Sequence, residues 1–151
     1  MFTLDYRLKD NSADPNGTAV FVESNEVDLR FRLALGDLIL VAPGVDLSTR
    51  WGWVPLIDLA AGLREVVNRL KRGGNQATFE FTESEATLTF SRNRDELIIT
   101  ASYAPGHVVS SLGSFDERLR QFERDLRADL VAAHPALDSH PVFNRLLPRV
   151  V

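Results

Sequence analysis

Alternation of apolar and polar residues is the feature that most limits what this chain can fold into. In the segment 2–9 every second residue is apolar, which is the period of a half-buried β-strand. The same period recurs at 18–23, at 27–35 and from 38 onward. Two-residue turns at Asn25-Glu26 and Gly36-Asp37 keep every large apolar side chain on one face, and a one-residue slip would expose them all. We therefore expect four antiparallel strands before residue 43.

A helix is predicted next, over residues 54–72. Pro55 suits the first helical position, and Gly73-Gly74 suits the end. The apolar residues recur at helical spacing: Leu56, Ala60, Leu63, Val66, Val67 and Leu70.

Three more antiparallel strands follow, with turns expected at Ser84-Glu85 and Asn93-Arg94. The expected pairs on the buried face are Phe81 with Leu88, Phe79 with Phe90, Phe90 with Leu97 and Leu88 with Ile99. Ser114 and Glu117 form a capping box for a second helix over 114–133, which ends at His134-Pro135. A short amphipathic tail over 141–147 should dock on the core.

The expected order is ββββ-α-βββ-α. This predicts an α+β fold with two layers, in which helices cover one face of one or more antiparallel sheets. The chain has 151 residues, of which 44% are apolar, and it shows no linker composition between its halves. We therefore expect a single domain over 1–151.

Composition excludes several kinds of protein. The absence of cysteine excludes disulfides, thiol catalysis and thiolate metal sites. No apolar run approaches the roughly 20 residues of a membrane span, and the first residues lack the order of a signal peptide, so we expect a cytoplasmic protein without membrane contact. Seventeen basic residues against 21 acidic ones give a net charge of −4, which argues against a nucleic-acid partner.

Catalytic and metal-binding patterns are absent from the sequence. There is no G-x-S-x-G motif, and the serine-rich run 110–114 lacks the lysine of a phosphate loop. His134 and His140 each precede a proline and do not share a helical face, so no metal site is expected. Carboxylates are candidates by residue type alone: Asp46, Asp58, Glu80, Glu83 and Glu85. We predict a non-enzyme without catalytic residues, cofactor or metal.

The segment Trp51-Gly52-Trp53 is the most distinctive feature of the loop before the first helix. Tryptophan is enriched at recognition sites, but an indole can also fold back as a lid on the core. We expect Trp53 to be buried and Trp51 to be partly exposed. The predicted partner-binding residues are Trp51, Arg50, Asp46 and His107, the last of these in a loop before the second helix.

The order of three sequence motifs resembles a known group of proteins. These are F-R-L-A-L-G-D at 31–37, W-V-P-L-I-D-L at 53–59 and F-x-F-T-E-S-x-A-T-L-T-F at 79–90, followed by a Phe- and Leu-rich capped helix. The pattern is similar to small bacterial immunity proteins encoded beside polymorphic toxins, of the wall-associated-toxin (WapI-like) kind. The resemblance implies a protein that binds and blocks one toxin domain.

Two functions are compatible with these observations. The first is a non-enzymatic protein-binding module, an immunity protein whose acidic groups attract a basic toxin domain. The second is a small-ligand-binding or enzymatic α+β domain, with a pocket walled by Trp51, Trp53, Tyr103 and His107. A closed core with an exposed patch favours the first function, and a deep apolar cavity favours the second. The sequence leaves the oligomeric state open.

Overall fold

A computed structural model describes residues 1–9, 25–82 and 84–149 of the chain. The strands are β1 (Thr3–Leu8), β2 (Leu35–Ala42), β3 (Val45–Asp46), β4 (Val54–Pro55), β5 (Gln76–Glu80), β6 (Thr87–Asn93), β7 (Glu96–Ala101) and β8 (Ala104–Ser111). The helices are α2 (Glu26–Phe31), α3 (Leu56–Lys71), α4 (Leu112–Ala133) and α5 (Pro141–Leu146), with a 3-10 helix η1 at Pro135–Ser139.

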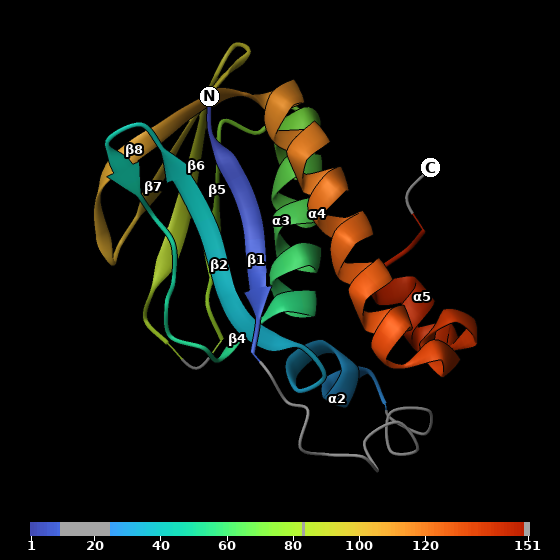
Figure 1. Cartoon of the computed structure of the whole chain (residues 1–151). Coiled ribbons are helices and arrows are strands. Elements are labelled where there is room, and N and C mark those ends of the chain that lie inside the picture. The colour runs from blue at the N-terminus through green and yellow to red at the C-terminus, as the bar shows by residue number, and fades with distance from the viewer. Residues whose placement is uncertain (10–24, 83, 150–151) are drawn as a thin grey trace.

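The strands form two antiparallel sheets. In the first, β2 pairs with β1, β3 and β4, and in the second the order is β5-β6-β7-β8. Helices α3 and α4 pack against each other, α3 contacting β2, β4 and β5 while α4 contacts β1 and β8. Figure 1 shows both long helices on one side of the strands. The predicted α+β class with antiparallel sheets is therefore confirmed.

The second sheet keeps the expected buried face but not the expected pairs. Phe79 pairs with Leu88 and Phe90 pairs with Ile99, so each register differs from the prediction by two residues. The turn after β6 is centred on Arg94 and Asp95, where Arg94 adopts a φ of 60°. A shift of two residues preserves the face of every side chain, and for this reason apolar periodicity alone does not determine the register.

The prediction of a strand over 27–35 is wrong, because residues 26–31 form helix α2. The Asn25 side chain accepts a hydrogen bond from the Asp28 backbone N–H at 3.0 Å and caps this helix. Acidic residues in its first turn and Arg30 in its last also match the helix dipole. Local capping therefore prevails over the period-2 pattern. The strand expected over 18–23 lies outside the described residues.

The expected turn at Gly36-Asp37 is also wrong. Both residues lie inside β2, which pairs with β1 so that Leu4 faces Leu40 and Leu8 faces Gly36. A Cβ atom at position 36 would overlap the backbone carbonyl oxygen of Arg7. This glycine therefore permits close approach of two strands rather than a change of direction.

Strand β8 was not predicted from the sequence. Residues 104–111 pair with β7, Val108 facing Ile99 and His107 facing Thr100. The expectation that His107 lies in a loop is therefore wrong. Pro105 and Gly106 follow the first residue of β8, which is an edge strand of its sheet, and an edge strand tolerates proline although Pro-Gly is typical of a loop.

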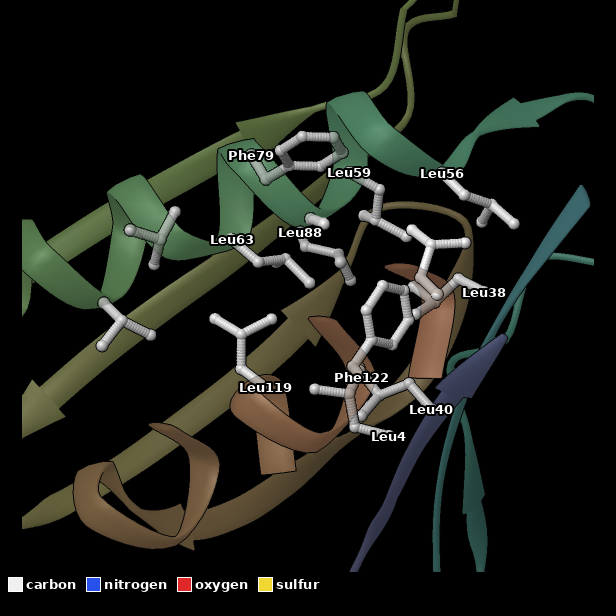
Figure 2. Close-up of a cluster of buried hydrophobic side chains, with 14 of the residues drawn as sticks. Leu4, Leu38, Leu40, Leu56, Leu59, Leu63, Phe79, Leu88, Leu119 and Phe122 are labelled. Carbon is white, nitrogen blue, oxygen red and sulfur yellow. The ribbon is translucent and has the colours of Figure 1, made fainter. Parts of the chain in front are cut away.

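The two long helices supply much of the core. Leu63 and Val67 of α3 are buried, as the helical spacing predicted, and so are Phe122 and Leu126 of α4. Figure 2 shows Leu63, Leu119 and Phe122 among strand residues such as Leu4, Leu40 and Leu88. Helix α4 begins two residues before the expected position, because Ser111 rather than Ser114 is its cap and accepts a hydrogen bond from the Ser114 N–H.

The amphipathic tail docks as expected. Phe143 and Leu147 are buried, while Val142 and Leu146 pack against the core from partly exposed positions. Among the described helices, none combines the length and the apolar character that a membrane span requires.

Candidate functional site

The loop that carries the two tryptophans is fixed along strand β2. Backbone N–H groups of Leu47 and Thr49 donate to the carbonyl oxygens of Leu40 and Leu38 at 2.8 and 3.0 Å. The Thr49 hydroxyl accepts from the Leu38 N–H at 2.9 Å, and both loop residues are buried. Residues 47–49 thus extend the sheet irregularly and set the direction of the chain that follows.

Trp51 packs inward on an aromatic cluster. Its ring contacts Phe81 and Tyr103 edge to face, with centroid distances of 5.4 and 5.2 Å. The Tyr103 hydroxyl donates to the Leu47 carbonyl at 2.6 Å, and burial, together with the charge of Asp46, raises the pKa of this phenol above its ordinary value. Trp51 is therefore half-buried and held from two sides.

Trp53 lies outside this cluster and is 39% exposed. Its ring stacks on Trp51 with a centroid distance of 5.1 Å and an interplanar angle of 21°. Gly52, between them, adopts a φ of 77° and donates its N–H to the Asp37 carboxylate at 2.7 Å. The prediction that Trp53 is the buried indole is wrong, because the left-handed glycine directs the second ring over the first.

An open hollow of about 420 Å³ lies beside Trp53. Its apolar lining comes from two separate segments, Val27, Phe31 and Leu35 on one side and Trp53 and Pro55 on the other, with Arg32 also present. Val27 is 55% exposed. Trp53 and Val27, two large apolar side chains that are exposed in the described part of the chain, thus line the same hollow. We call it the Trp53 hollow.

Asp46 and Arg50 lie together near the aromatic cluster. Their side chains form an ion pair at 2.8 Å. Hydrogen bonds from Ser48, together with the charge of Arg50, hold the pKa of Asp46 below its ordinary value. His107 is exposed on β8. The preceding residue, Gly106, lies close to Val45 of β3, and the two strands are in contact. The structure thus places Asp46, Arg50 and Trp51 together and His107 on the adjoining strand.

The four side chains that were expected to wall the pocket of the alternative function are not gathered around any one of five hollows found in the residues that the structure describes. The rings of Trp51 and Tyr103 are in contact, and of the four residues only Trp53 lines one of these five hollows.

The remaining candidate side chains have other contacts. His140 caps α5, its Nδ1 accepting from the Val142 N–H at 3.2 Å. Asp58 receives hydrogen bonds from Arg30 at 2.7 Å and from Thr82 at 3.0 Å. Glu80 and Glu85 are exposed, whereas Glu83 lies outside the described residues. Across the described ranges, no group of three His, Cys, Asp or Glu side chains is placed to hold a metal ion.

Sequence reasoning missed Val27 and Phe31 as surface residues of the Trp53 hollow. The alternating pattern assigned both to the buried face of a strand together with Leu29. In helix α2 only Leu29 is buried, because residues two apart point in different directions on a helix. The Asn25 cap followed by acidic residues was the signal that could have identified them.

Comparisons of the chain with protein-family models, with curated proteins and with solved structures found no match.

Proposed function

We propose that this protein is a protein-binding module, and that it acts as an immunity protein by binding and blocking a toxin domain. The observation that carries the proposal is the exposed face of Trp53 beside Val27, with its other face stacked on Trp51. Large apolar side chains that stay exposed in a folded chain commonly mark interaction sites.

Preorganisation makes Trp53 suitable as a binding anchor. Its ring is supported by Trp51, which Phe81 and Tyr103 hold in turn. A side chain that is already ordered loses little conformational entropy when a partner covers it, so more of the contact energy contributes to affinity. Rigid tryptophans at the centre of an interface are the residues that alanine scanning most often finds to dominate binding.

Charge favours a basic partner. The chain carries a net charge of −4, and residues 1–53, which hold Trp53 and Val27, contain eight acidic and five basic residues. Long-range attraction between an acidic protein and a basic toxin domain, such as a nuclease, speeds their encounter. The Asp46–Arg50 ion pair provides polar groups at the edge of the aromatic cluster, where specificity is commonly set.

The test is a search for a toxin domain encoded by a neighbouring gene, followed by a measurement of its binding to this chain. Trp53→Ala should raise the dissociation constant about 30-fold or more, which corresponds to a loss of about 2 kcal/mol in binding free energy. Val27→Ala should raise the dissociation constant by a smaller factor. The matched control is Val109→Ala, which also removes an exposed apolar side chain but lies on β8 outside the Trp53 hollow.

Two results would contradict the proposal. One is unchanged binding by a folded Trp53→Ala protein. The other is loss of biological function by His107→Ala or Asp46→Asn without loss of binding or stability, which would indicate a catalytic role for those groups instead.

A further inference from the structure

Strand β5 is an edge of the second sheet, and β6 is the one strand that pairs with it among the described residues. The Arg92 N–H donates to the Asn75 carbonyl at 2.8 Å, just before the strand begins. The Phe81 N–H donates to the Ala86 carbonyl at 3.1 Å, just after it ends. Backbone groups in an antiparallel pair alternate in direction, so residues 75, 77, 79 and 81 face β6. The N–H and C=O groups of the residues between them therefore point to the free edge: Gln76, Thr78 and Glu80.

The free edge of β5 is not used by other parts of the described chain. None of the backbone–backbone hydrogen bonds found there between separate elements involves Gln76, Thr78 or Glu80. The side chains of these three residues are exposed. An open strand edge presents a row of donors and acceptors with which another extended segment can pair. Three residues of β5 are therefore available to an added strand.

A hollow of about 670 Å³ lies beside this edge. Three consecutive residues of the strand line it, Thr78, Phe79 and Glu80, so the hollow follows β5 itself. On the opposite side the lining comes in part from Ala61 and Gly62 of α3. These are the two smallest residue types, and they leave room between the helix and the edge of the sheet. We call this hollow the β5 groove.

The charge that remains unpaired in the β5 groove is negative. Its two cations are already neutralised, because Arg30 pairs with Asp58 at 2.7 Å and Arg145 pairs with Glu26 at 2.9 Å. Glu65 of α3 has a side chain that is 62% exposed, and its ion pair is a long one, with Arg72 at 3.6 Å.

Glu80 is exposed as well, and it takes part in none of the ion pairs found within residues 1–9, 25–82 and 84–149. A strand with basic side chains complements the carboxylates of Glu65 and Glu80. A second copy of this chain fits less well, since its β5 would bring the same carboxylates into the groove.

Addition of a strand to an open sheet edge is an established mode of recognition, in which main-chain hydrogen bonds supply affinity and side chains supply specificity. We propose that the β5 groove binds an extended segment of a partner protein, which pairs with β5 and carries lysine or arginine side chains. Phe31 and Thr82 line both this groove and the Trp53 hollow, so the two surfaces are continuous. That the segment belongs to the toxin domain rests on the proposed function, whereas the groove and its chemistry do not.

The probe is a capped peptide of about seven residues in which lysine alternates with threonine or valine, added to the full isotope-labelled chain. Amide exchange followed by NMR should show that the Thr78 N–H, which faces the free edge, becomes protected as the peptide saturates the protein. Thr78→Pro should raise the dissociation constant of the peptide about fivefold or more, because it removes that donor. It removes no bond to β6, and proline is tolerated on an edge strand when its nitrogen faces outward. The matched control is Thr78→Val, which keeps the N–H and should bind as the unsubstituted protein does.

A second pair of variants tests the charge and does not depend on the folding of Thr78→Pro. Glu80→Lys should raise the dissociation constant about twofold to fivefold. Its control is Glu96→Lys, an exposed position on β7 outside the β5 groove. Added salt should weaken the binding of the peptide to the unsubstituted protein, because exposed charges are screened.

Unchanged exchange of the Thr78 amide at saturating peptide would overturn the proposal, and so would equal binding by folded Thr78→Pro and Thr78→Val proteins. An equal loss in the Glu96→Lys protein would indicate diffuse charge attraction instead of the groove. Tighter binding of the same peptide with glutamate in place of lysine would overturn the assignment to a basic segment. Protection of these amides by dimerisation without peptide would assign the edge to a second copy. Toxin binding is read out through Trp53, so its failure is distinguishable from failure here.

Discussion

The indole rings of Trp51 and Trp53 stack on each other at 5.1 Å, although one packs into an aromatic cluster and the other faces solvent. A single glycine in the left-handed region separates them. The inner ring therefore supports the outer one, and the two residues should respond differently to substitution.

Trp51→Ala should lower the free energy of unfolding by about 3 kcal/mol, because it removes contacts with Phe81 and Tyr103. Trp53→Ala should lower it by less than about 1 kcal/mol, as is usual for an exposed position. Urea denaturation measures both values. Acrylamide quenching provides a second measurement, since the fluorescence of the protein that retains Trp53 should be the more readily quenched. The reverse order of stabilities would mean that Trp53 is the lid.

Phe122→Ala should lower the free energy of unfolding by about 3–5 kcal/mol. The Phe122 side chain is buried in the core that α4 shares with the sheets, and its ring packs edge to face on Tyr6 at 5.1 Å. Chemical denaturation of the variant measures the loss. A loss below about 1 kcal/mol would mean that this face of α4 does not pack on the core.

Gly62→Ala should destabilise the protein by about 1–3 kcal/mol, against the usual preference for alanine in helices. A Cβ atom at position 62 of α3 would collide with the Phe79 ring, which lies beside this helix in Figure 2. Gly113→Ala is the control, because in α4 nothing lies within 4 Å of the added Cβ atom. Thermal unfolding of the two variants should therefore shift in opposite directions. Equal stabilisation would show that Phe79 can move aside without cost.

Stability should fall as pH decreases from about 4 to about 2, in part through Asp116. Burial alone would raise the pKa of this carboxyl, but hydrogen bonds from Lys71 and Arg64 outweigh burial and lower it from 3.8 to about 2. Because the pKa of Asp116 is lower in the folded protein than in the unfolded chain, its ionised form stabilises the fold by about 2 kcal/mol. This contribution is complete at a pH above the unfolded pKa and is lost as the pH falls through the folded pKa and Asp116 becomes protonated.

The measurement for Asp116 is the urea midpoint as a function of pH. Asp116→Asn should flatten the curve between pH about 4 and about 2, whereas the control Glu117→Gln, an exposed neighbour on α4, should leave its slope unchanged. Identical pH profiles for the Asp116→Asn and unsubstituted proteins would show that this network does not contribute to acid stability.

Much of the fold was predictable because its signals are local. The helical spacing from Leu56 to Leu70 predicted α3, and the Phe- and Leu-rich segment that ends at His134-Pro135 predicted α4. Alternation also identified β1 and the buried faces of β5, β6 and β7. In each of these cases the apolar period agrees with the local turn or helix-end signals, so the sequence indicates both the element and its buried face.

Which strands pair, and which side chains stay exposed, was decided by the tertiary structure. Residues 26–31 alternate like a strand yet form α2, because Asn25 caps them and Leu29 finds a buried site as a helical residue. Gly36 is typical of a turn in the sequence, but in the structure it lies within β2 and pairs with Leu8 of β1, a strand from a distant part of the sequence. Trp51 and Trp53 are both tryptophans and lie two positions apart. Trp51 is the one that packs inward, because Phe81 and Tyr103 from other segments of the chain contact its ring. Composition and periodicity indicate which side chains are suited to burial. Whether a given side chain is buried depends on contacts with residues that lie far away in the sequence.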